Sequence, residues 1–169
     1  MTGKKKIILG LAIALVAIQF IRPDANAGVA DSDKDITHVL SVPADVKNIL
    51  VTSCYDCHSN HTEPMWYMNL QPVGWWVGHH IKEGKEELNF SEFAGYSPKR
   101  QAHKLEEVAE QIERKEMPLS SYTWVHGNAK LSPEQAAILM KWAKAGHDSI
   151  KAKLPPTPPG GEHKSEHHG

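Results

Sequence analysis

Cys54-Tyr55-Asp56-Cys57-His58 is the stretch around which this sequence is organised. The chain of 169 residues has only two cysteines, which lie three positions apart and are followed at once by a histidine. This spacing is typical of covalent c-type haem attachment. Each thiol adds to one haem vinyl group, and the next residue supplies a nitrogen to iron. The pattern predicts one covalent haem c, with thioethers from Cys54 and Cys57 and with His58 as the proximal iron ligand.

Three other uses of a paired cysteine stay open at this point. Cys54 and Cys57 are also spaced for a structural disulfide or for a thioredoxin-like redox pair, although neither needs the adjacent histidine. A zinc site would require further cysteines or suitably spaced histidines. Haem attachment is the interpretation that uses every residue of the motif.

The first 27 residues have the pattern of an export signal. Lys4, Lys5 and Lys6 precede an apolar run over residues 7–21, and Ala25-Asn26-Ala27 offers a small-x-small cleavage site. The run of about 15 residues is shorter than the roughly 20 that span a bilayer. Residues 1–27 are therefore predicted to be a signal peptide or an uncleaved N-terminal membrane anchor. Both place the protein in the periplasm or on the outer face of the cytoplasmic membrane.

The charge balance limits the class of partner. Residues 1–27 contain four of the 19 Lys and Arg and one of the 20 Asp and Glu, so the remainder carries 15 basic and 19 acidic side chains and a formal charge of −4. A nucleic-acid-binding protein would be basic, so we expect no nucleic-acid partner. A mildly acidic surface suits redox partner proteins with a positive docking patch.

One small helical domain is expected between a polar tether over residues 28–42 and a Pro/Gly/His-rich disordered tail over residues 151–169. Helical spacing and cap residues predict four helices. The first leads from Pro43 into the motif, the second starts near Pro72, and the last two follow Ser97-Pro98 and Ser132-Pro133. Residues 43–150 are thus predicted to form an all-α, cytochrome c-like bundle of four to five short helices around the haem. The last helix is expected to stop at Gly146 and to pack across the helix before the motif.

Aromatic side chains are candidates for the haem pocket. Trp75 and Trp76 lie in an aromatic block after the motif, and Tyr122 lies in a later loop. Indole and phenol groups combine a large apolar body with one hydrogen-bond donor, which suits the wall of a porphyrin site. Ordinary core packing explains the two tryptophans equally well, and for Tyr122 packing over the loop is the preferred interpretation.

Several segments together resemble a known family. They are Cys-Tyr-Asp-Cys-His-Ser-Asn at 54–60, Trp-Tyr at 66–67, Gln-Pro-Val-Gly-Trp-Trp at 71–76, His-Ile-Lys-Glu-Gly at 80–84 and Leu-Asn-Phe-Ser at 88–91. In these elements the chain resembles the bacterial haem-binding domain family of small exported c-type cytochromes, over roughly residues 40–147. The resemblance implies covalent haem binding.

Met117 is the predicted sixth ligand of the iron. It follows an amphipathic helix, and Pro118 forces the chain into an extended loop that can approach the haem opposite His58. The family resemblance supports this choice, because the segment is similar to the Met-Pro loop of many small cytochromes c. His126, another residue or an open sixth position are the alternatives, and His61 is read as a polar loop residue.

A His–Met iron that keeps both ligands favours electron transfer over catalysis. The alternatives are a haem peroxidase-type enzyme, with His126 or His61 as acid/base group, and a haem-based redox or gas sensor with a displaceable sixth ligand.

Overall fold

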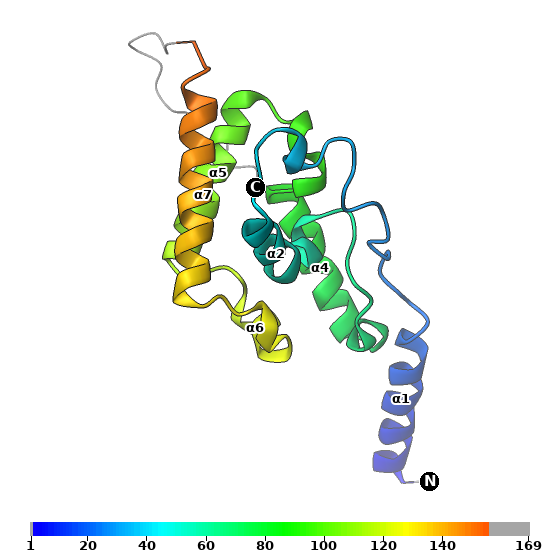
Figure 1. The fold of residues 1–169 in the computed structure, drawn as a ribbon. Coiled ribbons are helices and arrows are strands. Elements are labelled where there is room, and N and C mark those ends of the chain that lie inside the picture. The colour runs from blue at the N-terminus through cyan, green and yellow to red at the C-terminus, as the bar shows by residue number, and fades with distance from the viewer. Residues whose placement is uncertain (1, 156–169) are drawn as a thin grey trace, which may run out of the picture.

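The structure is a computed structural model that describes residues 2–155, and within them the chain is helical, with one isolated β-bridge between Ala27 and His61 (Figure 1). The all-α prediction is confirmed. The α-helices are α1 (Gly3–Ile18), α2 (Ala44–Ser53), α3 (Tyr55–His58), α4 (Val73–Glu87), α5 (Pro98–Glu113), α6 (Ser120–Val125) and α7 (Pro133–Lys151). The 3₁₀-helices are η1 (Ile36–His38), η2 (Trp66–Asn69), η3 (Phe90–Gly95) and η4 (Gly127–Ala129).

Helices α5 and α7 begin where their cap residues predict. The Ser97 side chain accepts a hydrogen bond from the Arg100 backbone N–H at the start of α5. At the start of α7, Ser132 and Gln135 form both halves of a capping box. Each satisfied N–H stabilises a helix end that would otherwise lack a partner.

Helix α7 packs mainly along α5, which differs from the expectation that it crosses the helix before the motif (Figure 1). Gly146 lies inside α7, where a Cβ would stand 3.0 Å from Leu40 Cδ1 and 3.2 Å from Leu105 Cδ1. The glycine therefore permits close packing instead of ending the helix, and α7 continues to Lys151. Its apolar face meets the complementary face of α5, because both present small and branched side chains at helical spacing.

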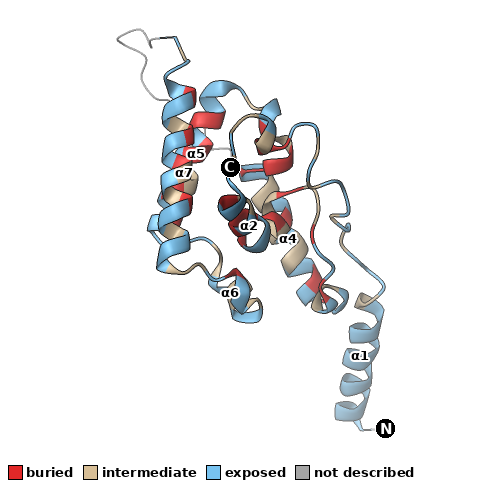
Figure 2. Ribbon diagram, in the orientation of Figure 1, coloured by how far each residue is buried: buried red, intermediate tan, exposed pale blue. Residues whose placement is uncertain are grey.

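The core lies between α2, η3, α5 and α7 (Figure 2). Its largest fully buried apolar side chains are Phe90, Phe93, Ile36, Leu50, Leu105 and Leu139. Helix α2 buries Val46, Ile49, Leu50 and Ser53, the face predicted from helical spacing. The core thereby fixes α2, whose C-terminal end leads directly into the cysteine motif.

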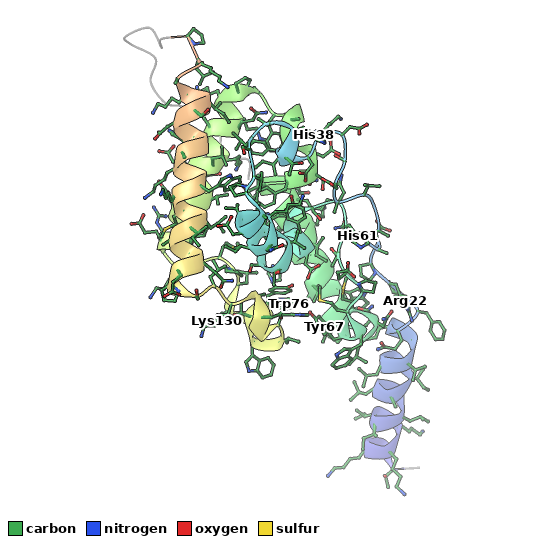
Figure 3. All side chains as sticks on the ribbon, viewed as in Figure 1. Arg22, His38, His61, Tyr67, Trp76 and Lys130 are labelled. Carbon is green, nitrogen blue, oxygen red and sulfur yellow. The ribbon has the colours of Figure 1, made fainter. Side chains whose placement is uncertain are left out.

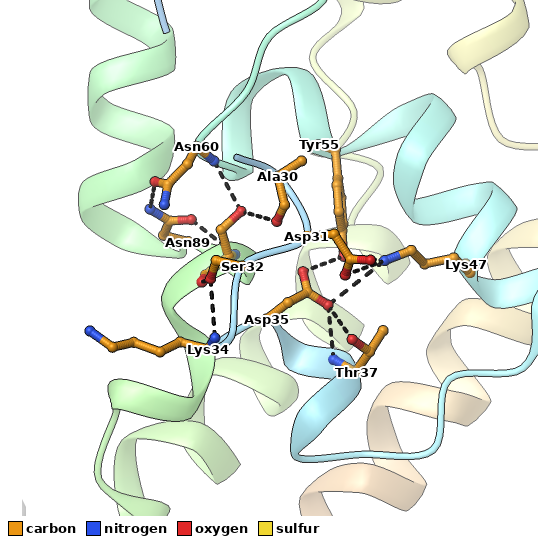
Figure 4. A network of polar contacts seen from close by, with 11 residues as sticks. Ala30, Asp31, Ser32, Lys34, Asp35, Thr37, Lys47, Tyr55, Asn60 and Asn89 are labelled. Atoms are coloured by element: carbon orange, nitrogen blue, oxygen red, sulfur yellow. Dashed lines mark hydrogen bonds and ion pairs between the residues drawn. The ribbon is translucent and has the colours of Figure 1, made fainter. Parts of the chain in front are cut away.

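Residues 28–42, which were expected to be a tether, pack onto the domain. Asp35 and Ile36 are fully buried. The Asp35 carboxylate accepts hydrogen bonds from the Tyr55 hydroxyl at 3.0 Å and from Thr37, and it lies 3.7 Å from the Lys47 amine (Figure 4). A buried carboxylate requires such partners, so this segment is a folded part of the structure.

Helix α1 projects from the end of the domain where α4 begins, and none of its side chains is buried (Figures 1 and 2). Within residues 2–155, no helix combines the length and the apolar character needed to cross a bilayer. The predicted tail lies outside the described residues from position 156 onward.

Candidate haem site

The cysteine motif forms one short helical turn directly after α2. The backbone N–H groups of Cys57 and His58 donate to the Cys54 carbonyl at 3.2 and 2.9 Å. Tyr55 anchors this turn to the core, because its ring stacks on Phe90 with centroids 5.5 Å apart. Both thiols and the imidazole of His58 are thus presented from a rigid element.

His58 is oriented by the backbone of the Leu-Asn-Phe-Ser segment. Its Nδ1 lies 2.9 Å from the Leu88 carbonyl oxygen. Since a carbonyl only accepts, Nδ1 carries the proton and Nε2 keeps a free lone pair. Burial lowers the pKa of His58. The ring is therefore held neutral, with Nε2 available as a metal ligand.

Asn89 and Ser91 of the same segment hold the residues after His58. Asn60 donates its backbone N–H to the Ser91 hydroxyl at 3.1 Å, and its side-chain oxygen accepts from Asn89 Nδ2 at 2.8 Å (Figure 4). The Cys-His-Ser-Asn and Leu-Asn-Phe-Ser segments therefore interlock. Both segments are among those that carry the family resemblance, and these contacts show how the two are held together.

A cavity of about 330 Å³ lies in front of the cysteine turn. Cys54, Cys57 and His58 line it on one side, and Met117, Pro118, Leu119 and Tyr122 line it on another. This volume lies at the lower end of the range of about 300–1,000 Å³ for small-molecule sites. The motif and the predicted distal residue, which are far apart in sequence, share this cavity.

Met117 is carried to the cavity by a sharp turn after α5. Lys115 adopts a left-handed conformation with φ of 59°. The backbone N–H groups of Glu116 and Met117 then donate to the Gln111 carbonyl at 2.9 and 3.3 Å. The Met117 side chain stays 36% exposed. It can therefore move toward a group bound in the cavity without disturbing the core.

A hydrogen bond from Tyr122 to Asp56 ties the two sides of the cavity together. The Tyr122 hydroxyl donates to Asp56 Oδ2 at 2.5 Å, and Asp56 Oδ1 accepts from the Glu63 backbone N–H at 3.0 Å. Burial, reinforced by the hydrogen bond to Asp56, raises the pKa of Tyr122. The hydroxyl therefore keeps its proton and remains a donor. Sequence reasoning placed Tyr122 at the pocket but gave no role to Asp56.

The model of one family, described as a haem-binding domain, matches residues 13–145. The chain belongs to the haem-binding domain family. Comparison with curated proteins and with solved structures gave no match. The family assignment confirms the resemblance drawn from the motifs and establishes haem as the ligand class of this protein.

The residues of the haem-binding domain fit such a group in chemical type. Two thiols, one neutral imidazole and one thioether are donors of the kinds that hold haem, and they face one cavity. Burial raises the pKa of Cys54 to about 12 and that of Cys57 to about 11. Redox-active Cys-x-x-Cys pairs instead have lowered thiol pKa values. The environment of the two thiols thus argues against thioredoxin-like chemistry.

Gly84 allows α4 to lie directly against the cysteine turn. A Cβ at this position would stand 2.8 Å from the Cys57 carbonyl oxygen. Any side chain would therefore push α4 away from α3. Gly84 lies inside α4, which continues to Glu87.

The two predicted pocket tryptophans lie outside the cavity lining of the haem-binding domain. Trp75 is 36% exposed and donates its indole N–H to the Ile21 carbonyl at 2.7 Å. Trp76 is 49% exposed and its ring packs edge-on against His80 (Figure 3). Their helical spacing is correct, but tertiary packing turns both rings toward other partners.

The histidines considered as alternative ligands also lie outside the cavity lining. His61 lies 3.7 Å from Glu63. His126 is hydrogen-bonded to the Tyr67 hydroxyl at 2.7 Å and stacks on Tyr122. His80 does line the cavity, and its Nδ1 lies 3.4 Å from Glu83. Sequence reasoning assigned His80 no role beyond its place in the family segment at 80–84.

Replacing Tyr122 with phenylalanine is expected to destabilise the haem-binding domain. The change removes the donor to Asp56 and leaves a partly buried carboxylate oxygen without this partner. A hydrogen bond to a charged group contributes about 1.5–3 kcal/mol, and partial exposure lowers the expected loss to about 1–2 kcal/mol. Urea unfolding of the full chain measures it. Tyr67→Phe is the matched control, and an equal loss in both variants would contradict a specific role for the Tyr122–Asp56 bond.

The haem-free chain is expected to lose stability at acidic pH. Since folding lowers the pKa of His58 below its ordinary value of 6.5, the unfolded chain binds more protons once the pH falls below that value. The contribution of the neutral His58 side chain to the free energy of unfolding is therefore fully present above pH 6.5. Below pH 6.5 it declines by at most about 1.4 kcal/mol per pH unit. Urea unfolding between about pH 8 and pH 5.5 measures this slope. His58→Gln should flatten it, and an unchanged slope would contradict the assignment.

Proposed function

We propose that this protein is an exported monohaem c-type cytochrome that carries electrons between redox partner proteins. The supporting observation is that Cys54, Cys57, His58 and Met117 line one cavity. These are the residue types that attach a haem and supply both axial ligands of an electron-transfer site. When bound, the haem supplies the one-electron chemistry of its iron.

The protein's contribution is attachment and orientation. The thiols of Cys54 and Cys57 would hold the group in place, and His58 would provide its free Nε2. The Leu88 carbonyl fixes the direction of the imidazole. The hydrogen bond to this carbonyl makes Nε2 a stronger metal ligand, because the proton on Nδ1 is already partly shared.

Met117 would supply a thioether sulfur as the second protein ligand of the group. A thioether opposite histidine raises the potential above that of a bis-histidine site. The Tyr122–Asp56 hydrogen bond supports this arrangement, because Tyr122 lies five residues after Met117 and binds the same turn that carries His58. The loop with Met117 is thereby kept beside the cavity.

Neither histidine considered for a peroxidase role lines the cavity, although His80, which is paired with Glu83, does. That enzyme class needs an acid/base side chain beside the open position of the iron. The two histidines considered for this role, His61 and His126, lie outside the cavity lining and have partners of their own. The carrier hypothesis requires neither of them.

Export and partner choice form part of the same proposal. The basic, apolar start of the chain is typical of an export signal, and covalent haem attachment in bacteria takes place outside the cytoplasm. The formal charge of −4 over residues 28–169 favours a partner with a positive patch.

A redox titration of the purified full chain tests the proposal. We expect a single reversible one-electron transition, and a haem that remains on the chain after denaturation. Mixing the reduced protein with hydrogen peroxide should give no catalytic turnover. Haem that dissociates on denaturation would contradict covalent attachment, and sustained peroxide turnover would favour the enzyme hypothesis.

A further inference from the structure

The expected cleavage site, Ala25-Asn26-Ala27, is built into the folded domain. The Asn26 side chain donates to the Ser59 carbonyl and to the Thr62 hydroxyl, both at 2.9 Å. Its side-chain oxygen accepts from the Lys85 amine at 2.7 Å, and its backbone carbonyl accepts from the Thr62 N–H at 2.8 Å. Asn26 thus joins the loop after His58 to helix α4.

The two residues that follow Asn26 continue this contact. Ala27 forms the isolated β-bridge with His61, and the Gly28 N–H donates to the Asn60 carbonyl at 2.8 Å. A Cβ at Gly28 would lie only 2.8 Å from that same oxygen, so the approach requires glycine. Residues 26–28 therefore brace the loop that leaves the predicted iron ligand.

Contacts upstream of this site tie the end of α1 to the start of α4. Gln19 pairs with the backbone of Gln71, donating to its carbonyl at 3.1 Å and accepting from its N–H at 2.9 Å. Arg22 donates to Asn69 at 2.7 Å (Figure 3). Trp75 donates to the carbonyl of Ile21. Residues 19–28, which we name the joint, are hydrogen-bonded to the domain along their length.

Helix α1, whose 16 residues are too few to cross a bilayer, nevertheless exposes the kind of side chains that insert into lipid. Its exposed apolar side chains include Ile7, Ile8, Leu9, Leu11, Ile13, Leu15 and Val16, which point in all directions around the helix. A groove on a partner protein would cover one face of such a helix, whereas lipid covers every face. Lys4, Lys5 and Lys6 at its start suit the charged boundary of a membrane.

Exposed apolar residues of the domain lie beside the joint. Trp66 is 77% exposed and Leu70 is 52% exposed, and η2, which contains Trp66, ends next to Leu70. Indole rings are enriched where lipid meets water, because they have an apolar body and one polar group. The end of the domain that holds α1 therefore also has the side chains that suit a lipid surface.

We propose that the leader is retained, and that α1 is a lipid anchor which the joint fastens rigidly to the haem-binding domain. Membrane lipid would thus cover the apolar side chains of α1 and, beside the joint, those of Trp66 and Leu70. The family match begins at residue 13, so the joint and the expected cleavage point lie within the matched residues. The inference rests on the export put forward above.

Cleavage after Ala27 would remove Asn26 from the structure. The backbone N–H of Thr62 and the carbonyl of Ser59 would then lose their partners, and both residues are buried. Buried polar groups without partners are destabilising. The loop beside His58 would consequently loosen. Retention of the leader therefore preserves the haem site as well as the attachment to the membrane.

The intact mass of the haem-bearing chain from bacterial membranes tests this inference. We expect a chain that still contains residues before Gly28, with the mass of one haem, and that stays in the membrane fraction after a carbonate wash. A haem-bearing chain that begins at Gly28 would overturn the inference while leaving the proposed carrier function intact. Release by carbonate would overturn the lipid assignment. Absence of haem from every form of the chain would overturn both proposals.

The Asn26→Ala variant tests the hydrogen bonds of the joint without changing the small residues of the cleavage motif. The variant keeps the small residues Ala25 and Ala27 but loses the three side-chain hydrogen bonds of Asn26. We expect chains that begin at Gly28 to rise from an undetectable to a measurable fraction. Asn69→Ala, which removes only the contact with Arg22, is the control and should remain full length. Equal processing of the two variants would contradict the role of Asn26 in the joint.

Discussion

Replacing His58 with alanine is expected to abolish the native haem spectrum of the protein. His58 has the only imidazole of the motif, and the Leu88 carbonyl holds it with Nε2 free. Loss of a group that merely supports a ligand costs about 10–100-fold in metal affinity, so loss of the ligand itself should cost more than about 100-fold. The visible absorption spectrum of the purified variant measures the change from a six-coordinate to a five-coordinate or haem-free state.

His61→Ala is the matched control for this experiment. His61 lies three residues further on, outside the cavity lining, and its ring is 3.7 Å from Glu63. Its removal should leave the spectrum unchanged. A normal spectrum in the His58 variant, or an equal loss in both variants, would show that the iron ligand lies elsewhere.

Replacing Met117 with leucine is expected to open the sixth position of the iron. Leucine preserves the apolar bulk of the side chain but has no sulfur, so the ferric protein should lose the weak far-red absorption band of sulfur ligation. Axial ligands set haem potentials over about 0.8 V, and loss of the thioether should lower the potential by on the order of 0.1–0.2 V. Potentiometric titration and the ferric spectrum measure the two effects.

Met140→Leu provides the comparison for Met117→Leu. Met140 lies on α7 and packs against the core, away from the cavity lining. The same substitution there should change neither the band nor the potential. If the Met117→Leu variant kept both the far-red band and the potential of the unmodified protein, Met117 would not be the distal ligand.

Local signals in the sequence were sufficient for much of the fold. The helix starts at Ser97-Pro98 and Ser132-Pro133 were predictable because a cap and its helix are neighbours in the chain. The cysteine turn was predictable for the same reason, since all of its chemistry lies within five residues. The buried face of α2 followed from spacing alone.

The contacts that orient the site could not be predicted in this way. The Leu88 carbonyl lies 30 residues from His58, and Tyr122 lies 66 residues from Asp56. A backbone carbonyl has no signature in a sequence, and a single Asp within the motif can point in many directions. Such pairs are set by the packing of whole helices.

Packing also explains the expectations that did not match the structure. The polar segment at 28–42 resembles a tether in composition, but its buried Asp35 has partners in Lys47 of α2 and in Tyr55. Trp75 and Trp76 have the right chemistry for a haem pocket, yet they contact Ile21 and His80 instead. Composition describes what a residue is able to do, whereas the neighbours decide which use is realised.

Addition of carbon monoxide to the reduced, full-length protein tests the central claim most directly. If His58 and Met117 both remain bound to the iron, no position is free, and the visible spectrum of the reduced protein should not change. Immediate formation of a carbon monoxide adduct by the unmodified protein would contradict the account, because it would show an open sixth position of the kind that a haem enzyme or a gas sensor requires.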